Sequence, residues 1–124
     1  MDINNIKSSG SFDMGHVSYL IIDDRYLSSA SISSIYADKI TWDFNRLIVH
    51  PKMRGKGYAS LLIGKVVEFC KHHKLLLRCG ISPYGGLDFQ QLKNFYIRHG
   101  FQETEYEDFV VLNFSDTAVF DITN

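Results

Sequence analysis

Apolar residues gather in three segments in the first half of the chain that predict β-strands, and in one of them they alternate with polar residues with a period of two. The segments are Val17–Asp23, Leu27–Tyr36 and Ile40–His50. The second alternates serines with small apolar residues, which is typical of a half-buried strand. The third ends in the aliphatic run Leu47–Val49, as expected for a buried strand end. The polar residues 1–15 predict a loose lead-in or one short edge strand.

Two later segments carry the three- and four-residue spacing of an amphipathic helix. Apolar positions recur with this spacing from Ala59 to His73, and the predicted helix ends in the basic run Lys71–Lys74, which suits the negative end of a helix dipole. A second helix is expected from Asp88, a good N-cap residue, to about His99. Gly100 then stands where a helix C-terminal glycine is usual.

Three further strands are predicted at Leu75–Ile81, Phe101–Glu107 and Phe109–Phe114. The expected order is therefore three strands, a helix, a strand, a helix and two strands. This order predicts a mixed α/β domain with few helices. Because no linker or repeat divides the sequence, residues 1–124 are predicted to form a single domain.

The junction between the third strand and the first helix has the features of an anion site. Pro51 ends the strand because it has no N–H to donate, and Gly55 and Gly57 precede the helix. The first N–H groups of a helix have no intrahelical partner, the helix dipole adds positive charge there, and glycine lets a ligand approach the backbone closely. Arg54 and Lys56 add cationic side chains. The junction thus predicts a phosphate or diphosphate site, with an ordinary solvated turn as the alternative.

This junction does not match the two best-known phosphate-binding motifs. A Walker loop requires Gly-Lys-Ser/Thr after a longer glycine spacing, whereas Gly57 is followed by Tyr58. A dinucleotide-binding fingerprint requires a third glycine or an alanine, and Ser60 stands at that position. The phosphate ligand therefore belongs to another class.

The composition of the chain disfavours several classes of function. The 124 residues include 13 basic and 14 acidic ones, a formal net charge of -1, and this balance disfavours a nucleic-acid binder. The apolar runs are too short for a bilayer and the N-terminus lacks a signal-peptide pattern, so no membrane association is expected. Cys70 and Cys79 have no metal-ligand spacing. We expect no metal site, two reduced thiols and a cytoplasmic location.

Two motifs, residues 47–59 and residues 95–101, resemble the signature of the GNAT superfamily of acyl-CoA-dependent N-acetyltransferases. Residues 47–59, Leu-Ile-Val-His-Pro-Lys-Met-Arg-Gly-Lys-Gly-Tyr-Ala, are similar to the family's strand ending in Leu-x-Val-x-Pro followed by Arg/Gln-x-x-Gly-x-Gly/Ala. Residues 95–101, Phe-Tyr-Ile-Arg-His-Gly-Phe, resemble its late helix ending in Tyr-x-x-x-Gly-Phe. The motifs occur in the family's order and spacing, and the resemblance covers residues 40–114.

The resemblance implies the acyl-CoA N-acyltransferase fold, an α/β (α+β) architecture with a central mixed, mostly antiparallel sheet and two main helices. Family members usually have one or two helices between their first two strands, which wall the acceptor site. The residues before Ile40 predict strands instead, so this chain resembles a short version with its N-terminal helical region reduced. An acceptor site that is open, or completed by a second subunit in a homodimer, is then expected. Phe89 stands where many members have an asparagine that contacts the cofactor.

The resemblance also implies a reaction, the direct transfer of an acetyl group from acetyl-CoA to a primary amine. Tyr96 matches the family's tyrosine, which acts as a general acid toward the departing thiolate, and a packing role is its alternative. The backbone of Leu47, Ile48 and Val49 would pair with the pantetheine arm. The coenzyme diphosphate would be held by Arg54, Gly55, Lys56, Gly57, Tyr58 and Ala59.

The amine must lose a proton before it can attack the thioester, so a base or a water chain is needed. Asp43 is the first candidate, because it falls where the histone-acetyltransferase branch carries its glutamate. Asp43 is also expected to share strand parity with Leu47 and Val49. His50, water and a purely solvated Asp43 are the alternatives.

Two other functions are compatible with the sequence. The main alternative is a catalytically weak or inactive module that binds CoA or a partner protein. A nucleic-acid binder that uses the basic turn from Lys52 to Lys56 is the third. For an acetyltransferase, the acceptor is a small-molecule or protein amine, and polyamine, amino acid, aminoglycoside and protein lysine all stay open.

Overall fold

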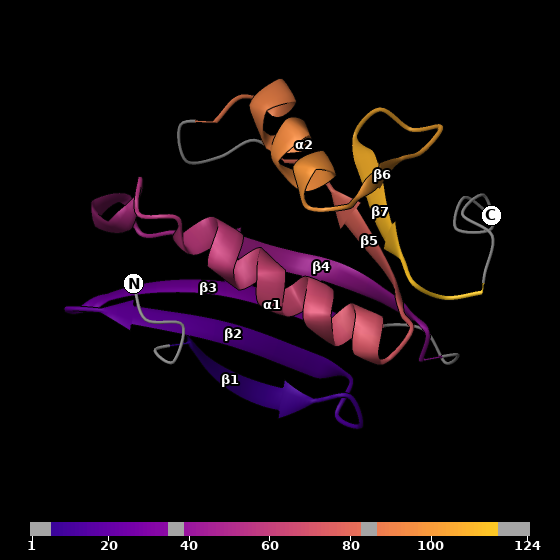
Figure 1. The fold of residues 1–124 in the computed structure, drawn as a ribbon, viewed down its shortest axis with the longest axis horizontal. Coiled ribbons are helices and arrows are strands. Elements are labelled where there is room, and N and C mark those ends of the chain that lie inside the picture. The colour runs from indigo at the N-terminus through magenta and orange to yellow at the C-terminus, as the bar shows by residue number, and fades with distance from the viewer. Residues whose placement is uncertain (1–5, 35–38, 83–86, 117–124) are drawn as a thin grey trace.

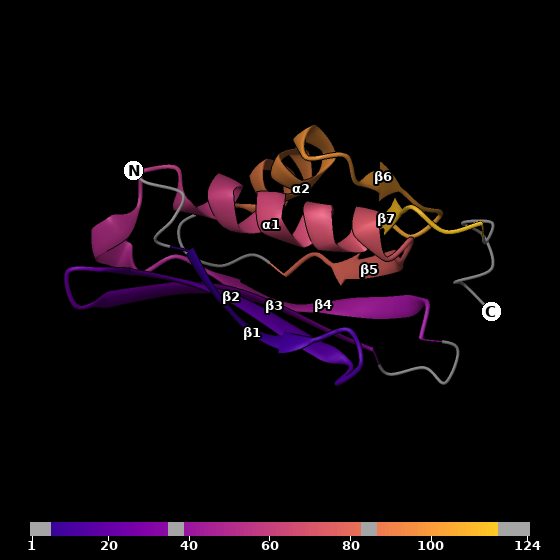
Figure 2. The same cartoon turned by 60° about the horizontal axis from the view of Figure 1, so that its bottom comes forward.

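The fold is built on one seven-stranded sheet, seen in a computed structural model that describes residues 6–34, 39–82 and 87–116. The strand order is β1-β2-β3-β4-β5-β7-β6. Both α-helices lie on the same face of this sheet, and the two views in Figure 1 and Figure 2 agree on this. The mixed sheet and its two helices confirm the predicted fold class.

The first four strands form an antiparallel meander. They are β1 (Ile6–Ser11), β2 (His16–Asp23), β3 (Tyr26–Ser34) and β4 (Thr41–Ile48). Alternation decides which side of β3 enters the core, because Ala30 and Ile32 are buried in the core while Ser31 between them is only partly buried and faces the other way. Among the described residues before Pro51, the regular elements are therefore strands and none is an α-helix. The polar segment at the start of the chain supplies the edge strand β1.

Strands β4 and β5 (Leu76–Gly80) run parallel, and they pair over only three positions. The pairs join Thr41–Asp43 to Leu76–Arg78, although β4 continues to Ile48. Figure 1 shows the two strands separating beyond this point. After Asp43, the side of the β4 backbone that faces β5 is therefore not paired with β5. The site described below lies at the opening between these two strands.

The two helices form where the apolar spacing predicted them. Helix α1 (Tyr58–His72) buries Leu62, Ile63 and Val66 against the sheet. Helix α2 (Phe89–Arg98) begins with a capping box, in which the Asp88 carboxylate accepts from the Gln91 N–H at 2.8 Å and the Gln91 side chain accepts from the Asp88 N–H at 3.0 Å. Trp42 is fully buried at the centre of the core that these elements enclose.

The last two strands differ from their predicted bounds. Strand β6 spans only Gln102–Glu103, and β7 spans Phe109–Asn113. The Thr104 hydroxyl lies 3.1 Å from the carbonyl oxygens of both Tyr106 and Phe109, which closes a turn and stops the ladder. The predicted strand over 101–107 is thus wrong after its third residue, because a side chain competes with the neighbouring strand for the backbone groups.

Candidate active site

The turn between β4 and α1 presents free backbone donors. A short 3-10 helix, η2 (Pro51–Met53), leads into Gly55 and Gly57, whose φ angles are 85° and 83°. Only glycine adopts this left-handed conformation without a steric penalty. Gly57 is the N-cap of α1, no side chain caps it, and the first intrahelical bond runs from the Leu61 N–H to the Gly57 carbonyl at 3.1 Å. The three N–H groups before Leu61 precede the first intrahelical bond, and backbone donors in this position suit an anion.

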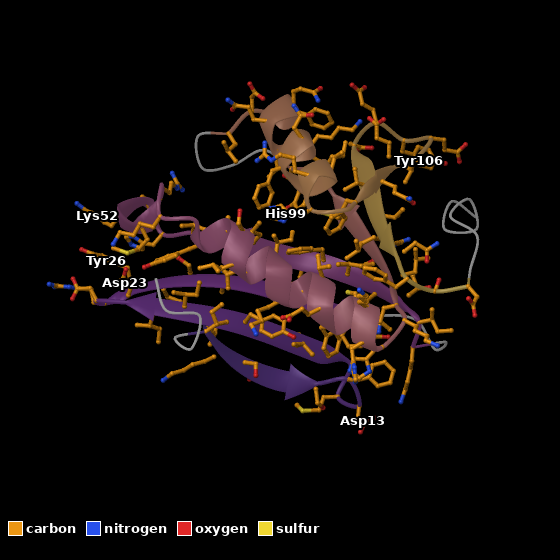
Figure 3. The ribbon with its side chains drawn as sticks, in the orientation of Figure 1. Asp13, Asp23, Tyr26, Lys52, His99 and Tyr106 are labelled. Atoms are coloured by element: carbon orange, nitrogen blue, oxygen red, sulfur yellow. The ribbon has the colours of Figure 1, made fainter. Side chains whose placement is uncertain are left out.

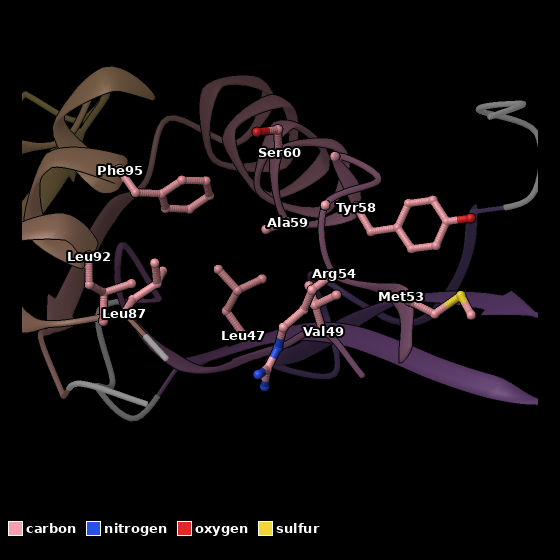
Figure 4. A pocket seen from close by; sticks show the side chains of 12 residues that line it. Leu47, Val49, Met53, Arg54, Tyr58, Ala59, Ser60, Leu87, Leu92 and Phe95 are labelled. Carbon is pink, nitrogen blue, oxygen red and sulfur yellow. The ribbon is translucent and has the colours of Figure 1, made fainter. Parts of the chain in front are cut away.

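A cavity of about 250 Å³ opens directly beside this turn. Figure 4 shows Leu92 and Phe95 of α2 on one side, with the start of α1 and the end of β4 completing the wall. Most of its wall is apolar, which suits an extended arm with few charges. It is lined by Leu47, Val49, Met53, Arg54, Gly55, Gly57, Tyr58, Ala59, Ser60, Leu87, Leu92 and Phe95.

The turn is anchored from beneath by Asp23, the last residue of β2. Its Oδ2 atom accepts a hydrogen bond from the buried Tyr58 hydroxyl and lies 3.2 Å from the Lys56 ammonium. These contacts, the Tyr58 hydroxyl first and Lys56 second, lower the pKa of Asp23, and the same bond raises the pKa of Tyr58. In Figure 4 the Tyr58 hydroxyl points out of the cavity. The anchor leaves the Lys56 ammonium ion-paired and outside the cavity wall.

The β2–β3 hairpin supports the same turn through His50. The Tyr26 ring lies 4.4 Å from the His50 ring, and the His50 N–H donates to the Ser28 hydroxyl at 3.3 Å. The Lys52 N–H donates to His50 Nδ1 at 3.1 Å, so one ring nitrogen caps η2. Figure 3 shows Asp23, Tyr26 and Lys52 gathered at this end of the molecule. His50 therefore has a local structural role, and it lines neither cavity.

The start of α1 is also tied to the end of α2. The Ser60 hydroxyl lies 3.3 Å from His99 Nε2. Burial, and then the nearby Arg98 charge, lower the pKa of His99. The Phe95 ring, which lines the cavity, packs against the His99 ring with 4.7 Å between centroids. This contact fixes the spacing of the two helices that flank the cavity.

A second cavity, of about 340 Å³, occupies the opening between β4 and β5. The buried Tyr96 lies in its wall, and its hydroxyl hydrogen-bonds to Cys79, whose thiol pKa burial raises to about 12. Leu47 lines both cavities, so the two meet at this residue. The second cavity is lined by Phe44, Asn45, Arg46, Leu47, Ile48, Cys79, Gly80, Ser82 and Tyr96.

Asp43 lies outside both cavity walls. Its carboxylate forms a two-point ion pair with Arg78, with 2.8 Å from Nε to Oδ1 and 3.3 Å from Nη2 to Oδ2. The expected parity with Leu47 is wrong, because a β-bulge at Asn45 shifts the register between β3 and β4. Trp42 and Leu47 consequently both face the core, while Asp43 faces the opposite side of the sheet.

The structure distributes the sequence-predicted residues over several places. Seven of the nine predicted cofactor residues line the first cavity, Ile48 lines the second, and Lys56 lines neither. The sequence did not indicate the contacts of two residues. Asp23 reads only as the end of a strand before a turn, and Cys79 reads only as a small buried hydrophobic residue. No spacing links either residue to the turn or to Tyr96, so only their contacts reveal them.

Comparison with known families gives a match that spans both helices and the turn between β4 and α1. The family model of the acetyltransferase (GNAT) domain matches residues 15–103. The chain belongs to the GNAT family. Comparison with curated proteins gives no match. Within the described ranges, neither α-helix has the length and apolar character that crossing a bilayer requires.

Solved structures show the same GNAT fold at low sequence identity. A protein assigned to this family from Desulfovibrio desulfuricans is 20% identical with a TM-score of 0.60, over 83% of this chain and 72% of that chain. The anti-CRISPR protein AcrVA5 is 16% identical with a TM-score of 0.60, over 78% of this chain and 97% of that one. An aminoglycoside 6'-acetyltransferase type Ii is 14% identical with a TM-score of 0.59, over 84% and 72% respectively.

Proposed function

We propose that this GNAT protein is an N-acetyltransferase that moves an acetyl group from acetyl-CoA directly to a primary amine. The observation that carries the proposal is the meeting of two cavities at Leu47. One begins at a turn whose backbone donors suit a diphosphate, and the other contains a tyrosine in the opening between two strands. A donor held in the first cavity would deliver its thioester at the entrance to the second.

Acetyl-CoA would supply the activated acetyl group, and the residues of the chain would hold it. The N–H groups at the start of α1 and the Arg54 guanidinium would bind the diphosphate. The backbone from Leu47 to Val49, at the end of β4 that β5 does not pair with, would pair with the amides of the arm. The apolar wall from α2 would cover the remainder. The turn, the strand edge and the apolar wall would thus match the diphosphate, the amides and the aliphatic part of the arm in charge and polarity.

Tyr96 would supply the proton that the leaving thiolate requires. Its hydroxyl lies beside the Cys79 sulfur, so the pocket already accommodates a hydrogen bond between this hydroxyl and a sulfur atom. Asp43 stays the first candidate for the base. Its carboxylate is held by Arg78 outside the cavity wall, so it would act through water. Water alone is the alternative for this step.

The proposal is tested by two measurements on the purified chain. Acetyl-CoA binding is measured by calorimetry, and release of free CoA thiol is then followed with a panel of primary amines. Transfer is established when the acetylated amine is found by mass spectrometry. Tight acetyl-CoA binding with no transfer to any amine would instead support a CoA-binding or protein-interaction module, the alternative that the reduced N-terminal region favours.

We also infer the cellular compartment and the oligomeric state of the protein. Cys70 and Cys79 are buried free thiols, which agrees with a reducing compartment, and we infer a cytoplasmic location. Both helices lie on one face of the sheet, and no α-helix within residues 6–34, 39–82 and 87–116 covers the other face, where a second subunit would complete an acceptor site. Light scattering across a range of protein concentrations would establish whether a homodimer forms.

A further inference from the structure

Arg46 follows a β-bulge in β4 and lines the second cavity. Arg46 pairs with Ser31 and Phe44 pairs with Ile32, so Asn45 is the extra residue. In a regular strand, two successive side chains point to opposite faces. Here Asn45 and Arg46 are both exposed and both line the cavity. Bulges next to active sites commonly redirect a side chain in this way.

Arg46 is the one charged side chain among the described residues that line this cavity. Within residues 6–34, 39–82 and 87–116, no acidic side chain forms an ion pair with it. The nearest carboxylate along β4 is Asp43, which Arg78 already holds at two points. The neighbouring Asn45 amide is bonded to the Ser33 hydroxyl and adds no charge. The described wall of the cavity therefore carries a positive charge with no negative one to balance it.

We propose that the acceptor is an amine that also carries a carboxylate, with the carboxylate bound by Arg46 and the amine directed toward Tyr96. The proposal rests on the proposed acetyl transfer and specifies its substrate class. An arginine guanidinium matches a carboxylate through two parallel hydrogen bonds. A polyamine or an aminoglycoside would bring further positive charges to a cavity whose described residues offer no carboxylate to receive them. Amino acids and related small molecules therefore fit better.

The test compares three acceptors that share a four-carbon chain and an amine of similar basicity. They are γ-aminobutyrate, butylamine and putrescine, and an α-amino acid panel is run beside them. A hydrogen-bonded charge pair changes kcat/KM by about 10-fold to 100-fold. The wild-type protein is thus expected to prefer γ-aminobutyrate over butylamine by about this factor, and to use putrescine least.

Substitutions at Arg46 then connect the preference to this side chain. Arg46→Met keeps much of the side-chain length and should abolish the preference between γ-aminobutyrate and butylamine. Arg46→Glu should reverse the order, so that putrescine becomes the better acceptor. Arg25→Met is the matched control, because Arg25 is exposed on the β2–β3 turn and lines neither cavity. Acetyl-CoA affinity and the thermal midpoint should stay unchanged in all three variants.

Different results would refute the carboxylate-bearing acceptor and the acetyl transfer itself. A wild-type preference for putrescine or butylamine, or an unchanged preference in Arg46→Glu, would overturn the carboxylate assignment while leaving acetyl transfer intact. An absence of transfer to every amine, with acetyl-CoA still bound, would overturn the proposed function and the acceptor class together. Acetylation confined to protein lysines would also refute the assignment.

Discussion

Replacing Gly57 with alanine tests the diphosphate site at its most sensitive residue. Gly57 has a φ angle of 83°, and a Cβ atom added there meets no atom of the described residues within 4 Å apart from its two chain neighbours. The cost of the substitution is therefore conformational and not a clash within the protein. A left-handed non-glycine residue costs about 1–2 kcal/mol, and the more restricted unfolded chain returns about 0.4–1 kcal/mol of this.

The net loss of stability should be close to 1 kcal/mol. For a chain of this length, such a loss lowers the thermal midpoint by about 3–6 °C, which differential scanning calorimetry can measure. The added methyl group would also stand beside the cavity, where the diphosphate approaches the backbone. Because hydrogen bonds to charged groups are worth about 1.5–3 kcal/mol, the dissociation constant for acetyl-CoA should rise by about 10-fold to 100-fold.

Gly64→Ala is the matched control for Gly57→Ala. Gly64 lies inside α1, its φ is outside the left-handed range, and an added Cβ meets nothing within 4 Å. Alanine should stabilise this helix by about 0.5–1 kcal/mol and leave acetyl-CoA binding unchanged. If Gly57→Ala folds and binds acetyl-CoA as tightly as Gly64→Ala does, the diphosphate is not held at this turn.

Three other substitutions test the remaining parts of the site. Tyr96→Phe should lower kcat by about 100-fold with little change in acetyl-CoA affinity, and unchanged turnover would leave Tyr96 with a packing role only. Asp23→Asn should raise the KM for acetyl-CoA but not lower kcat, because the turn loses its anchor. Because the pKa of Asp23 is lowered in the folded chain, its ionised carboxylate stabilises the fold above the ordinary pKa of 3.8, and this stabilisation is lost as the pH falls through the folded pKa. The free energy of unfolding should therefore depend less on acid pH in Asp23→Asn than in the wild-type chain. Asp43→Asn should lower kcat without raising acetyl-CoA KM if Asp43 is the base, whereas a thermal midpoint lowered at constant kcat would show that the Arg78 pair is structural.

Local patterns were sufficient for the helices and for the turn. The apolar spacing from Ala59 onward, the Asp88 cap and Gly100 each act within a few residues of chain, so their effects can be predicted without the fold. The same holds for Gly55 and Gly57, whose place before a helix predicts an anion site on backbone grounds alone. The GNAT resemblance depends on these local features, and for this reason it was visible in the sequence.

Contacts between distant segments decided the rest. The bulge at Asn45 reverses the expected parity of Asp43 with Leu47, and it arises from the pairing of β4 with another strand, β3. Asp23 reaches Tyr58 and Lys56 only because the β2–β3 hairpin folds beneath the turn. The second cavity exists because β4 and β5 stop pairing after three positions. The amino-acid sequence alone thus determined the anion-binding turn through local backbone preferences. The tertiary structure decided which side chains line the two cavities, because side-chain packing and strand register depend on contacts between different segments of the chain.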